Sequence, residues 1–166
     1  MQQLRNLGIE HIVMLTGDSE PAARKAAELL GIDEYHSQVL PENKSAYVQK
    51  LRDEGRTVIM VGDGINDSPA LACADVSVAL ADASDIARAV ADISVLDASL
   101  EKLVTMRMLA QALMRRIHGD YRFIVTFNTA LIALGVSGVI SITAAAYLHN
   151  ASTLAISAAS TRPDLD

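Results

Sequence analysis

Short apolar runs alternate with longer amphipathic stretches in the first part of the chain. Residues 11–15 (His-Ile-Val-Met-Leu) and 57–61 (Thr-Val-Ile-Met-Val) are rich in β-branched side chains, and each run stops at a loop that contains glycine and aspartate. This pattern is typical of a buried strand in a parallel sheet. We therefore predict a strand at each place.

Helical periodicity separates these strands. Apolar side chains recur every three or four residues after Ser19, which can cap a helix, and the pattern stops at Gly31. The same reasoning predicts helices at 42–54 and 84–91 and further short strands at 77–80 and 93–96. The order of elements predicts an α/β fold with a doubly wound parallel sheet, whose ligand site lies beyond the carboxyl ends of the strands.

A long stretch in the second part of the chain contains no charged residue. The 39 residues from Phe123 to Thr161 include no Asp, Glu, Lys or Arg. This stretch is too long for one membrane-spanning helix and suits two helices joined at Ser137-Gly138. We expect spans at about 121–138 and 141–160, which together form a two-helix transmembrane hairpin. A buried helical hairpin in a soluble protein is the alternative.

The flanking charges predict an orientation for such a hairpin. Arginines precede the first span at positions 107, 115, 116 and 122, and the positive-inside rule places that end in the cytoplasm. We therefore expect a multi-pass protein of the plasma or inner membrane with residues 1–120 in the cytoplasm. The expected divisions are a partial domain at 1–98, a connecting helix at 99–120, the hairpin at 121–160 and a cytoplasmic tail at 161–166.

Composition excludes several classes of function. A net charge of −6 without a basic cluster argues against a nucleic-acid partner, because phosphate backbones are bound by concentrated Lys and Arg. The single cysteine, Cys73, excludes a disulfide framework and a multi-thiolate metal site within this chain.

Three loop segments occur in a characteristic order. They are Thr16-Gly17-Asp18, Pro41-Glu42-Asn43-Lys44, and the eleven residues Val-Gly-Asp-Gly-Ile-Asn-Asp-Ser-Pro-Ala-Leu at 61–71. This series resembles the P (phosphorylation) domain of P-type ATPases, in the haloacid-dehalogenase-like superfamily, and the hairpin looks like the last two membrane helices of the heavy-metal branch. The segment at 61–71 is the specific one, whereas Thr16–Asp18 alone is more often a simple turn and Lys44 alone a solvated helix residue.

The resemblance implies a set of site residues. Phosphoryl transfer through an aspartyl phosphate requires hydrogen-bond donors, an ammonium group and Mg²⁺ around the phosphate. The implied catalytic residues are Thr16, Lys44, Asp63 and Asp67; the phosphate-binding set is Thr16, Gly17, Asp18, Lys44 and Asn66; and the Mg²⁺ ligands are Asp63 and Asp67, the latter directly or through water.

The nucleophile of that family is the Asp of an Asp-Lys-Thr-Gly-Thr motif, which this sequence does not contain. We therefore expect the chain to be the C-terminal portion of an ATP-driven heavy-metal cation pump and to be inactive alone. Its implied partners are the lipid bilayer, the actuator and nucleotide domains and the earlier helices. The alternatives are a membrane-anchored, non-catalytic half-subunit or remnant, and a small Mg²⁺-dependent phosphatase of the same superfamily.

Polar residues in the hairpin are candidates for contacts with the transported ion. Copper-type relatives carry Tyr-Asn in the penultimate helix, matched by Phe127-Asn128, and Met-x-x-Ser-Ser in the last helix, matched by residues 149–153. Histidine replaces the methionine here, and imidazole suits a transition or heavy-metal cation such as Zn, Co, Ni, Fe or Mn better than Cu(I). The candidates are Asn128, His149, Ser152 and Thr153. A helix-packing hydrogen bond is the alternative role for His149.

Overall fold

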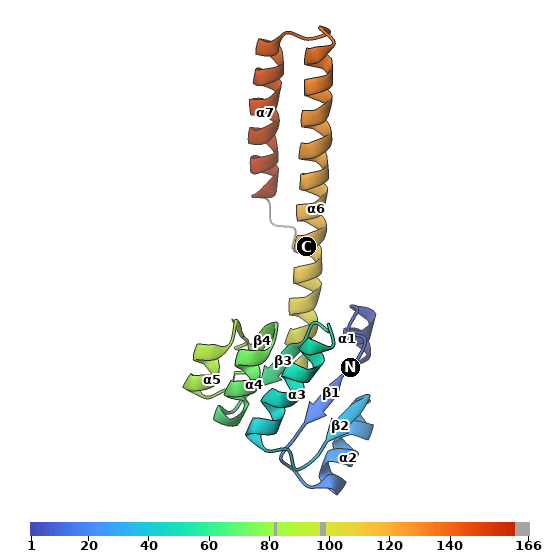
Figure 1. Ribbon diagram of the computed structural model, residues 1–166, viewed down its shortest axis with the longest axis vertical. Coiled ribbons are helices and arrows are strands. Elements are labelled where there is room, and N and C mark those ends of the chain that lie inside the picture. Colours follow the sequence, from blue (N-terminus) through green and yellow to red (C-terminus); the bar gives the residue numbers. More distant parts are fainter. Residues whose placement is uncertain (82, 97–98, 162–166) are drawn as a thin grey trace. The chain divides into compact units, whose positions relative to one another are not determined.

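The computed structural model describes residues 1–81, 83–96 and 99–161 (Figure 1). The chain forms two compact units that divide between Met108 and Leu109. The tail expected at 161–166 lies, apart from Thr161, outside the described residues, and so do positions 97–98, where the first domain was expected to end.

The first unit alternates short strands with helices, and each strand and helix predicted within it is confirmed. Its elements are α1 (Gln2–Asn6), β1 (Val13–Leu15), α2 (Glu20–Leu30), β2 (Glu34–His36), α3 (Pro41–Asp53), β3 (Ile59–Gly62), the 3₁₀ helix η1 (Ile65–Asp67), α4 (Ser68–Cys73), β4 (Val76–Ala79), α5 (Asp85–Val90) and β5 (Ile93–Ser94). Helix α1 and strand β2 were not predicted.

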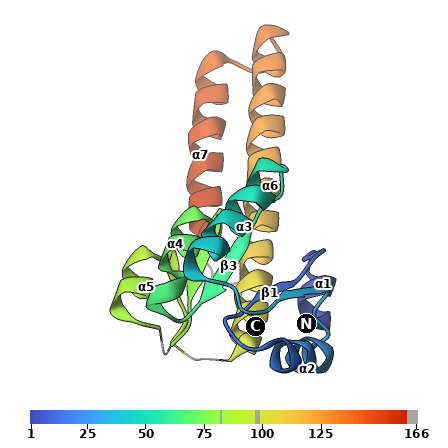
Figure 2. The same cartoon turned by 60° about the horizontal axis from the view of Figure 1, so that its bottom comes forward.

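The strands are all parallel, but they form two sheets and not the single sheet expected. One sheet has the order β1-β2, and the other has the order β3-β4-β5. Both sheets can be followed in Figures 1 and 2, and no ladder joins β1 to β3 among the described residues. Strands β1 and β3 therefore each have one edge without a strand partner in the described part of the chain.

Small side chains allow the helices to approach the larger sheet closely. Leu71 of α4 packs with Ala79 of β4 and with Ala83 and Ala87, all of them buried. At the other end of the strands, Asp92 accepts hydrogen bonds from both the amide and the hydroxyl of Ser77, which lowers the pKa of the Asp92 carboxyl. Because Ala79 is the ladder partner of Gly62, the cluster around Leu71 lies next to the carboxyl end of β3, from which the candidate site extends.

The second unit is a helical hairpin. Helix α6 (Leu100–Val136) is continuous through the expected boundary at 120, and α7 (Ile142–Ser160) follows a turn that contains Gly138 in the left-handed conformation (φ 74°). Ser141 caps α7 by accepting from the amide of Ala144 at 3.1 Å. The hairpin and its turn at 137–138 are confirmed, whereas a division between a connecting helix and a first span is not.

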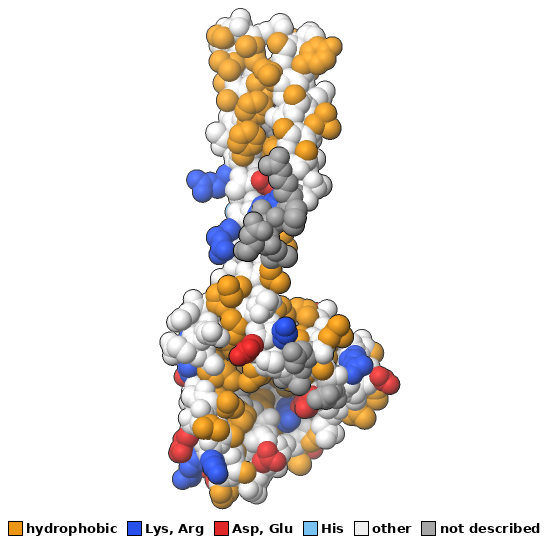
Figure 3. Space-filling view, turned by 180° about the vertical axis from the view of Figure 1, so that it is seen from behind, with side chains coloured by type: hydrophobic (Ala, Val, Ile, Leu, Met, Phe, Trp, Pro, Cys, Tyr) orange, Lys and Arg blue, Asp and Glu red, His pale blue; other side chains and the backbone are white. Residues whose placement is uncertain are grey.

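No helix in the described ranges is long and apolar enough to cross a membrane, so the transmembrane character expected for 121–160 is not confirmed. In Figure 3, apolar side chains gather on the end of the hairpin that carries the turn, and Lys and Arg side chains lie toward its other end. Exposed apolar residues along the hairpin include Phe123, Ile132, Val136, Ile142 and Leu154.

Candidate functional site

A nearly buried ion pair joins the start of α3 to the end of η1. The Nζ atom of Lys44 donates to Oδ1 of Asp67 at 2.7 Å, and the side chains are only 13% and 11% exposed. Removing two charges from water is unfavourable unless they pair. Lys44 and Asp67, which the sequence assigned to one site, are therefore brought together in the structure.

Glycine at position 62 makes room for this pair. A Cβ atom on Gly62 would lie 2.7 Å from Cβ of Asp67 and 3.2 Å from its Oδ2. In the Asp67 carboxylate, Oδ1 thus accepts from Lys44, and Oδ2 lies toward the backbone of Gly62. This also explains why Asp67 precedes α4 without a capping hydrogen bond from its side chain. The polar residues Asp67 and Ser68 at the start of α4 predict a side-chain cap from one or the other, and neither forms it among the residues described.

Asp63 follows β3 directly and is exposed. Its backbone carbonyl accepts from the amide of Ser84 at 3.0 Å, and Ser84 in turn caps α5 through its hydroxyl. The backbone at Asp63 is thereby held, while the carboxylate has no hydrogen-bond partner within the described ranges. The exposed amide of Asn66 is likewise without a side-chain partner in that part of the chain.

The loop after β1 is closed by hydrogen bonds of its own. The Thr16 hydroxyl donates to Oδ2 of Asp18 at 2.9 Å, and it accepts from the Asp18 amide at 3.1 Å. The hydroxyl proton of Thr16 is therefore directed to Asp18 in this arrangement, and not outward as a donor to phosphate.

Residues before α3 connect this loop to Lys44. The amides of Gln38 and Val39 donate to the carbonyls of Asp18 and Thr16, each at 2.9 Å. Gln38 adopts the left-handed conformation (φ 54°), which is unusual for a residue other than glycine. Sequence analysis did not identify these two residues, and no pattern in the chain marks them.

Glu34, on β2, is the centre of a second cluster of polar side chains. Its carboxylate accepts from His11 Nε2 at 2.9 Å, from His36 Nε2 at 2.8 Å and from the Tyr47 hydroxyl at 2.8 Å. These donors lower the pKa of Glu34 to about 2, with His11 the largest contributor. Burial, followed by the bond to Glu34, raises the pKa of Tyr47 to about 12. His11 and His36 show no ligand spacing in the sequence, which indicates simple surface residues; in the structure both are parts of this cluster.

The carboxylates near Gly62 fit a partial magnesium site. Mg²⁺ is usually held by one or two carboxylates, with water and phosphate oxygens completing its octahedron. Asp63 and Asp67, whose Oδ2 has no hydrogen-bond partner among the described residues, are the two carboxylates that would form such a pair. In the described part of the chain, no three His, Cys, Asp or Glu residues are grouped to hold a metal, so the remaining ligands would have to come from other groups.

One buried hydroxyl near Asp67 is unsatisfied. The Oγ atom of Ser68 is buried and has no hydrogen-bond partner among the residues described. A buried hydroxyl without a partner is unfavourable by about 1–3 kcal/mol, so an additional group at this place would be stabilising.

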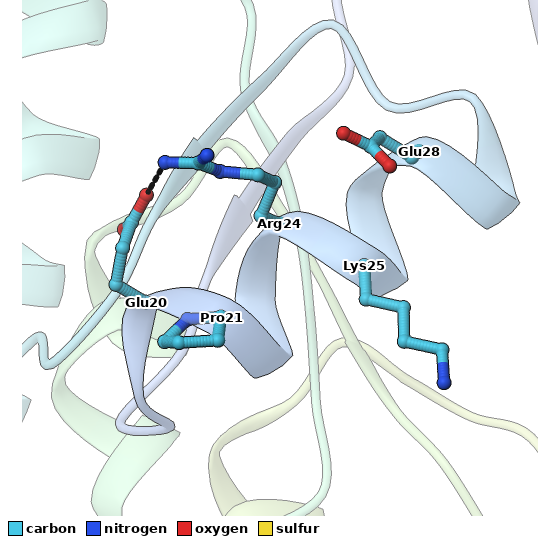
Figure 4. Close-up of a pocket in the computed structure, with 5 residues that line it drawn as sticks. All are labelled: Glu20, Pro21, Arg24, Lys25 and Glu28. Carbon is cyan, nitrogen blue, oxygen red and sulfur yellow. Dashed lines mark hydrogen bonds and ion pairs between the residues drawn. The ribbon is translucent and has the colours of Figure 1, made fainter.

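Two surface hollows lie outside the loop that carries Asp63 and Asp67. One is formed by a single helix, α2, where Arg24 pairs with Glu20 at 3.0 Å and Lys25 points away (Figure 4). Another lies beside the Thr16–Asp18 loop and is lined by Leu15, His36, Ser37, Gln38, Val39, Asn43 and Tyr47. The side chains of the first hollow do not converge on a ligand.

The four candidate ion-binding residues are linked to one another in the hairpin. His149 Nδ1 and Asn128 Oδ1 are 2.8 Å apart, joining α7 to α6. The hydroxyls of Ser152 and Thr153 both donate to the His149 carbonyl, at 2.8 and 3.0 Å. The structure therefore brings this set together within the second unit.

Comparisons with known proteins agree with the motif series. Residues 1–75 match the haloacid dehalogenase-like hydrolase family. The chain is 43% identical over 163 residues to a zinc-exporting P-type ATPase of Mycobacterium marinum, covering 98% of this chain and 22% of that protein. It is 42% identical over the same length to a manganese-exporting P-type ATPase of Mycobacterium tuberculosis, covering 98% of this chain and 23% of the relative. The chain thus spans about a fifth of the length of these relatives.

Comparison with solved structures also finds similarity to heavy-metal P-type ATPases. The crystal structure of a zinc-transporting PIB-type ATPase in the E2.Pi state matches 95% of this chain and 26% of its own, with a TM-score of 0.86 and 31% identity. The catalytic domain of the CPx-ATPase CopB-B matches 64% of this chain and 42% of its own, with a TM-score of 0.60 and 40% identity. Phosphatase structures with identities below 25% share the fold alone.

Proposed function

Since the chain contains a haloacid dehalogenase-like hydrolase domain and is homologous over nearly its whole length to heavy-metal P-type ATPases, we propose that it forms part of an ATP-driven metal-cation pump. Its first unit would supply residues that handle phosphate and Mg²⁺. Its hairpin would belong to the ion-conducting part. The other domains and helices of the pump would be its partners.

The ion pair between Lys44 and Asp67 carries this proposal. The nearly buried ammonium of Lys44, held 2.7 Å from the Asp67 carboxylate, supports a role in phosphoryl transfer, which requires a positive group as well as carboxylates for Mg²⁺. The charge of Lys44 would compensate that of a phosphate while its bond to Asp67 keeps the side chain in place. A solvated helix lysine would not be buried in this way.

The remaining site residues have roles consistent with their contacts. Asp63 and Oδ2 of Asp67 would hold Mg²⁺, which when bound neutralises phosphoryl oxygens. The Gly17 amide and the Asn66 side chain would donate to phosphate. Asp18 would orient Thr16, whose hydroxyl must turn from Asp18 before it can donate to phosphate.

The phosphorylated aspartate would come from a strand that adds to the free edges of β1 and β3. The Thr16 amide donates to the His36 carbonyl, and the Ile12 carbonyl accepts from the Glu34 amide. Every second residue from Ile12 to Thr16 therefore directs its backbone groups to β2. In a parallel ladder the intervening residues, Val13 and Leu15, point their backbone groups to the opposite edge. A strand docked there would pair with both sheets. Without it, the chain would not hydrolyse ATP.

The hairpin would enter the membrane only when packed against other helices of the pump. Its small and polar residues favour close helix packing and hydrogen bonds between helices, and they lower its own apolarity. In this arrangement, residues 1–120 would be cytoplasmic, in a plasma or inner membrane. Asn128, His149, Ser152 and Thr153 would lie along the route of a divalent transition-metal cation.

A chimera tests the proposed function. This chain would replace the matching 163 residues of the Mycobacterium marinum zinc-exporting ATPase, and zinc-stimulated ATP hydrolysis would be measured in membranes. We expect zinc-stimulated hydrolysis by the chimera and none by the 166-residue chain alone. A well-expressed, membrane-inserted chimera without zinc-stimulated hydrolysis would refute the proposal.

A further inference from the structure

The hydrogen bond between the two helices of the hairpin fixes a proton on His149. The Nδ1 atom of His149 lies 2.8 Å from Oδ1 of Asn128, a carbonyl oxygen that carries no hydrogen. Nδ1 must therefore be the donor. In the neutral imidazole the other nitrogen, Nε2, then has a free lone pair, which is the form that binds metal ions.

The neighbouring hydroxyls are arranged in a similar way. Ser152 and Thr153 lie three and four residues after His149, on the same face of α7, and both donate their protons to the His149 carbonyl. Their oxygen lone pairs remain available as acceptors. The turn from His149 to Thr153 therefore offers one nitrogen and two oxygen atoms as potential ligands for a cation.

No charged group between residues 123 and 161 competes for this role. Residues 123–161 contain no Asp, Glu, Lys or Arg, so no carboxylate of the hairpin between these positions can orient the imidazole. Metal-binding histidines almost always donate their second ring N–H to such an outer partner. Asn128 is the side chain that fills this position.

We propose that Asn128 is a positioning residue and not an ion ligand. By accepting from Nδ1–H it holds His149 in the tautomer that presents Nε2 to a divalent cation of borderline softness, such as Zn²⁺. The inference rests on the proposed pump function for the identity of the cation. It separates two residues that the sequence placed together as ligands.

The experiment uses the full 166-residue chain in detergent micelles, labelled with ¹⁵N-histidine. The signals of His149 are assigned as those that are missing from the spectrum of His149→Ala. Two-bond ¹⁵N–¹H correlations then report which ring nitrogen carries the proton. Zn²⁺ is then titrated while the His149 nitrogens are followed separately from the other three histidines. The variants are Asn128→Leu, which removes the acceptor, and Asn128→Asp, which keeps an acceptor oxygen. Asn150→Leu is the matched control, because Asn150 is exposed and its side chain makes no hydrogen bond in the described part of the chain.

We expect the Nδ1–H form of His149 in the unmodified chain, in Asn128→Asp and in Asn150→Leu, with Zn²⁺ shifting Nε2. In Asn128→Leu the tautomer should change, and the apparent dissociation constant for Zn²⁺ at His149 should rise about 10- to 100-fold. Protonation at Nε2 in the unmodified chain, or no change of tautomer in a folded Asn128→Leu chain, would overturn the proposal. Should Asn128→Leu not fold, loss of the Nδ1–H form in Asn128→Asp would also overturn it.

If Zn²⁺ does not shift the Nε2 signal of the unmodified chain, the proposal that His149 presents Nε2 to a metal ion is overturned, even when the tautomer is as expected. None of these readouts requires ATP hydrolysis. A chimera that hydrolyses ATP in response to zinc while His149 shows the wrong tautomer would therefore separate the failure of this inference from the failure of the proposed function.

Discussion

The Lys44 ammonium and the Asp67 carboxylate form an ion pair of 2.7 Å between positions 23 residues apart in the sequence. The pair joins α3 to the segment that follows β3, and both side chains are nearly buried. Because it is shielded from water, the pair matters to folding as well as to the charge of the candidate site.

Breaking this pair should destabilise the protein strongly. Lys44→Met or Asp67→Asn alone leaves a buried group without its partner and should lower the free energy of unfolding by about 3–5 kcal/mol. The double variant should lose less than the two single variants combined. Urea denaturation of the full chain, followed by circular dichroism, measures the effect. Arg24→Met breaks the exposed pair with Glu20 and serves as the control, for which a much smaller change is expected.

Gly62→Ala should disturb the site by steric overlap. The new Cβ would lie 2.7 Å from Cβ of Asp67, so the backbone or Asp67 must move. We expect a loss of about 1–3 kcal/mol in unfolding free energy. Gly119→Ala on α6 is the control, because no atom lies within 4 Å of its added Cβ and alanine favours the helix by about 0.5–1 kcal/mol. Equal stability of Gly62→Ala and the unmodified chain would show that Asp67 does not need this space.

Most helices and strands were predictable because local patterns specify them. Gly31 ends α2 in the left-handed conformation (φ 66°), as its position after the apolar stripe indicates. Strand β2 was missed because Glu34-Tyr35-His36 is short and polar and is stabilised by side-chain contacts to Glu34 that no local pattern reveals. The split into two sheets was also not predictable, since pairing depends on which edges meet in three dimensions.

The candidate site was predictable in its residues and not in its contacts. The segment at 61–71 marked Asp63 and Asp67, but the partner of Asp67, at Nζ of Lys44, follows only from the packing of α3. Similarly, Phe127-Asn128 and the residues from His149 to Thr153 could be named from the sequence. The direction of the hydrogen bond from His149 to Asn128 could not, because it depends on how α6 and α7 face each other.

Acid should weaken the protein partly through Glu34. The folded-state pKa of Glu34 is about 2, below its ordinary value of 4.5, so its ionised form stabilises the fold above about pH 4.5. That contribution is lost as the pH falls from about 4.5 toward about 2. Glu34→Gln should therefore be less stable near neutral pH and lose less stability over this range, as measured by urea midpoints at several pH values. Identical acid sensitivity of the two proteins would contradict the role of the Glu34 cluster.

Tyr47 should make the stability of the protein sensitive to alkaline pH. Its folded-state pKa is raised from 10 to about 12, so its neutral form stabilises the fold below about pH 10, and this contribution is lost as the pH rises toward about 12. Tyr47→Phe should lose less stability than the unmodified chain in that alkaline range. The same urea midpoints, extended to high pH, provide the measurement. Equal losses would contradict the burial of Tyr47 together with its bond to Glu34.

The most direct test of the account is phosphoenzyme formation from radiolabelled ATP in the chimeric pump. Asp63→Asn removes one proposed Mg²⁺ ligand with little change in size, and Asp53→Asn, at the exposed end of α3, is the matched control. We predict that Asp63→Asn lowers the rate of phosphoenzyme formation by about two orders of magnitude or more, while Asp53→Asn leaves it unchanged. Undiminished phosphorylation of a well-expressed Asp63→Asn chimera would contradict the claim that this loop serves phosphoryl transfer.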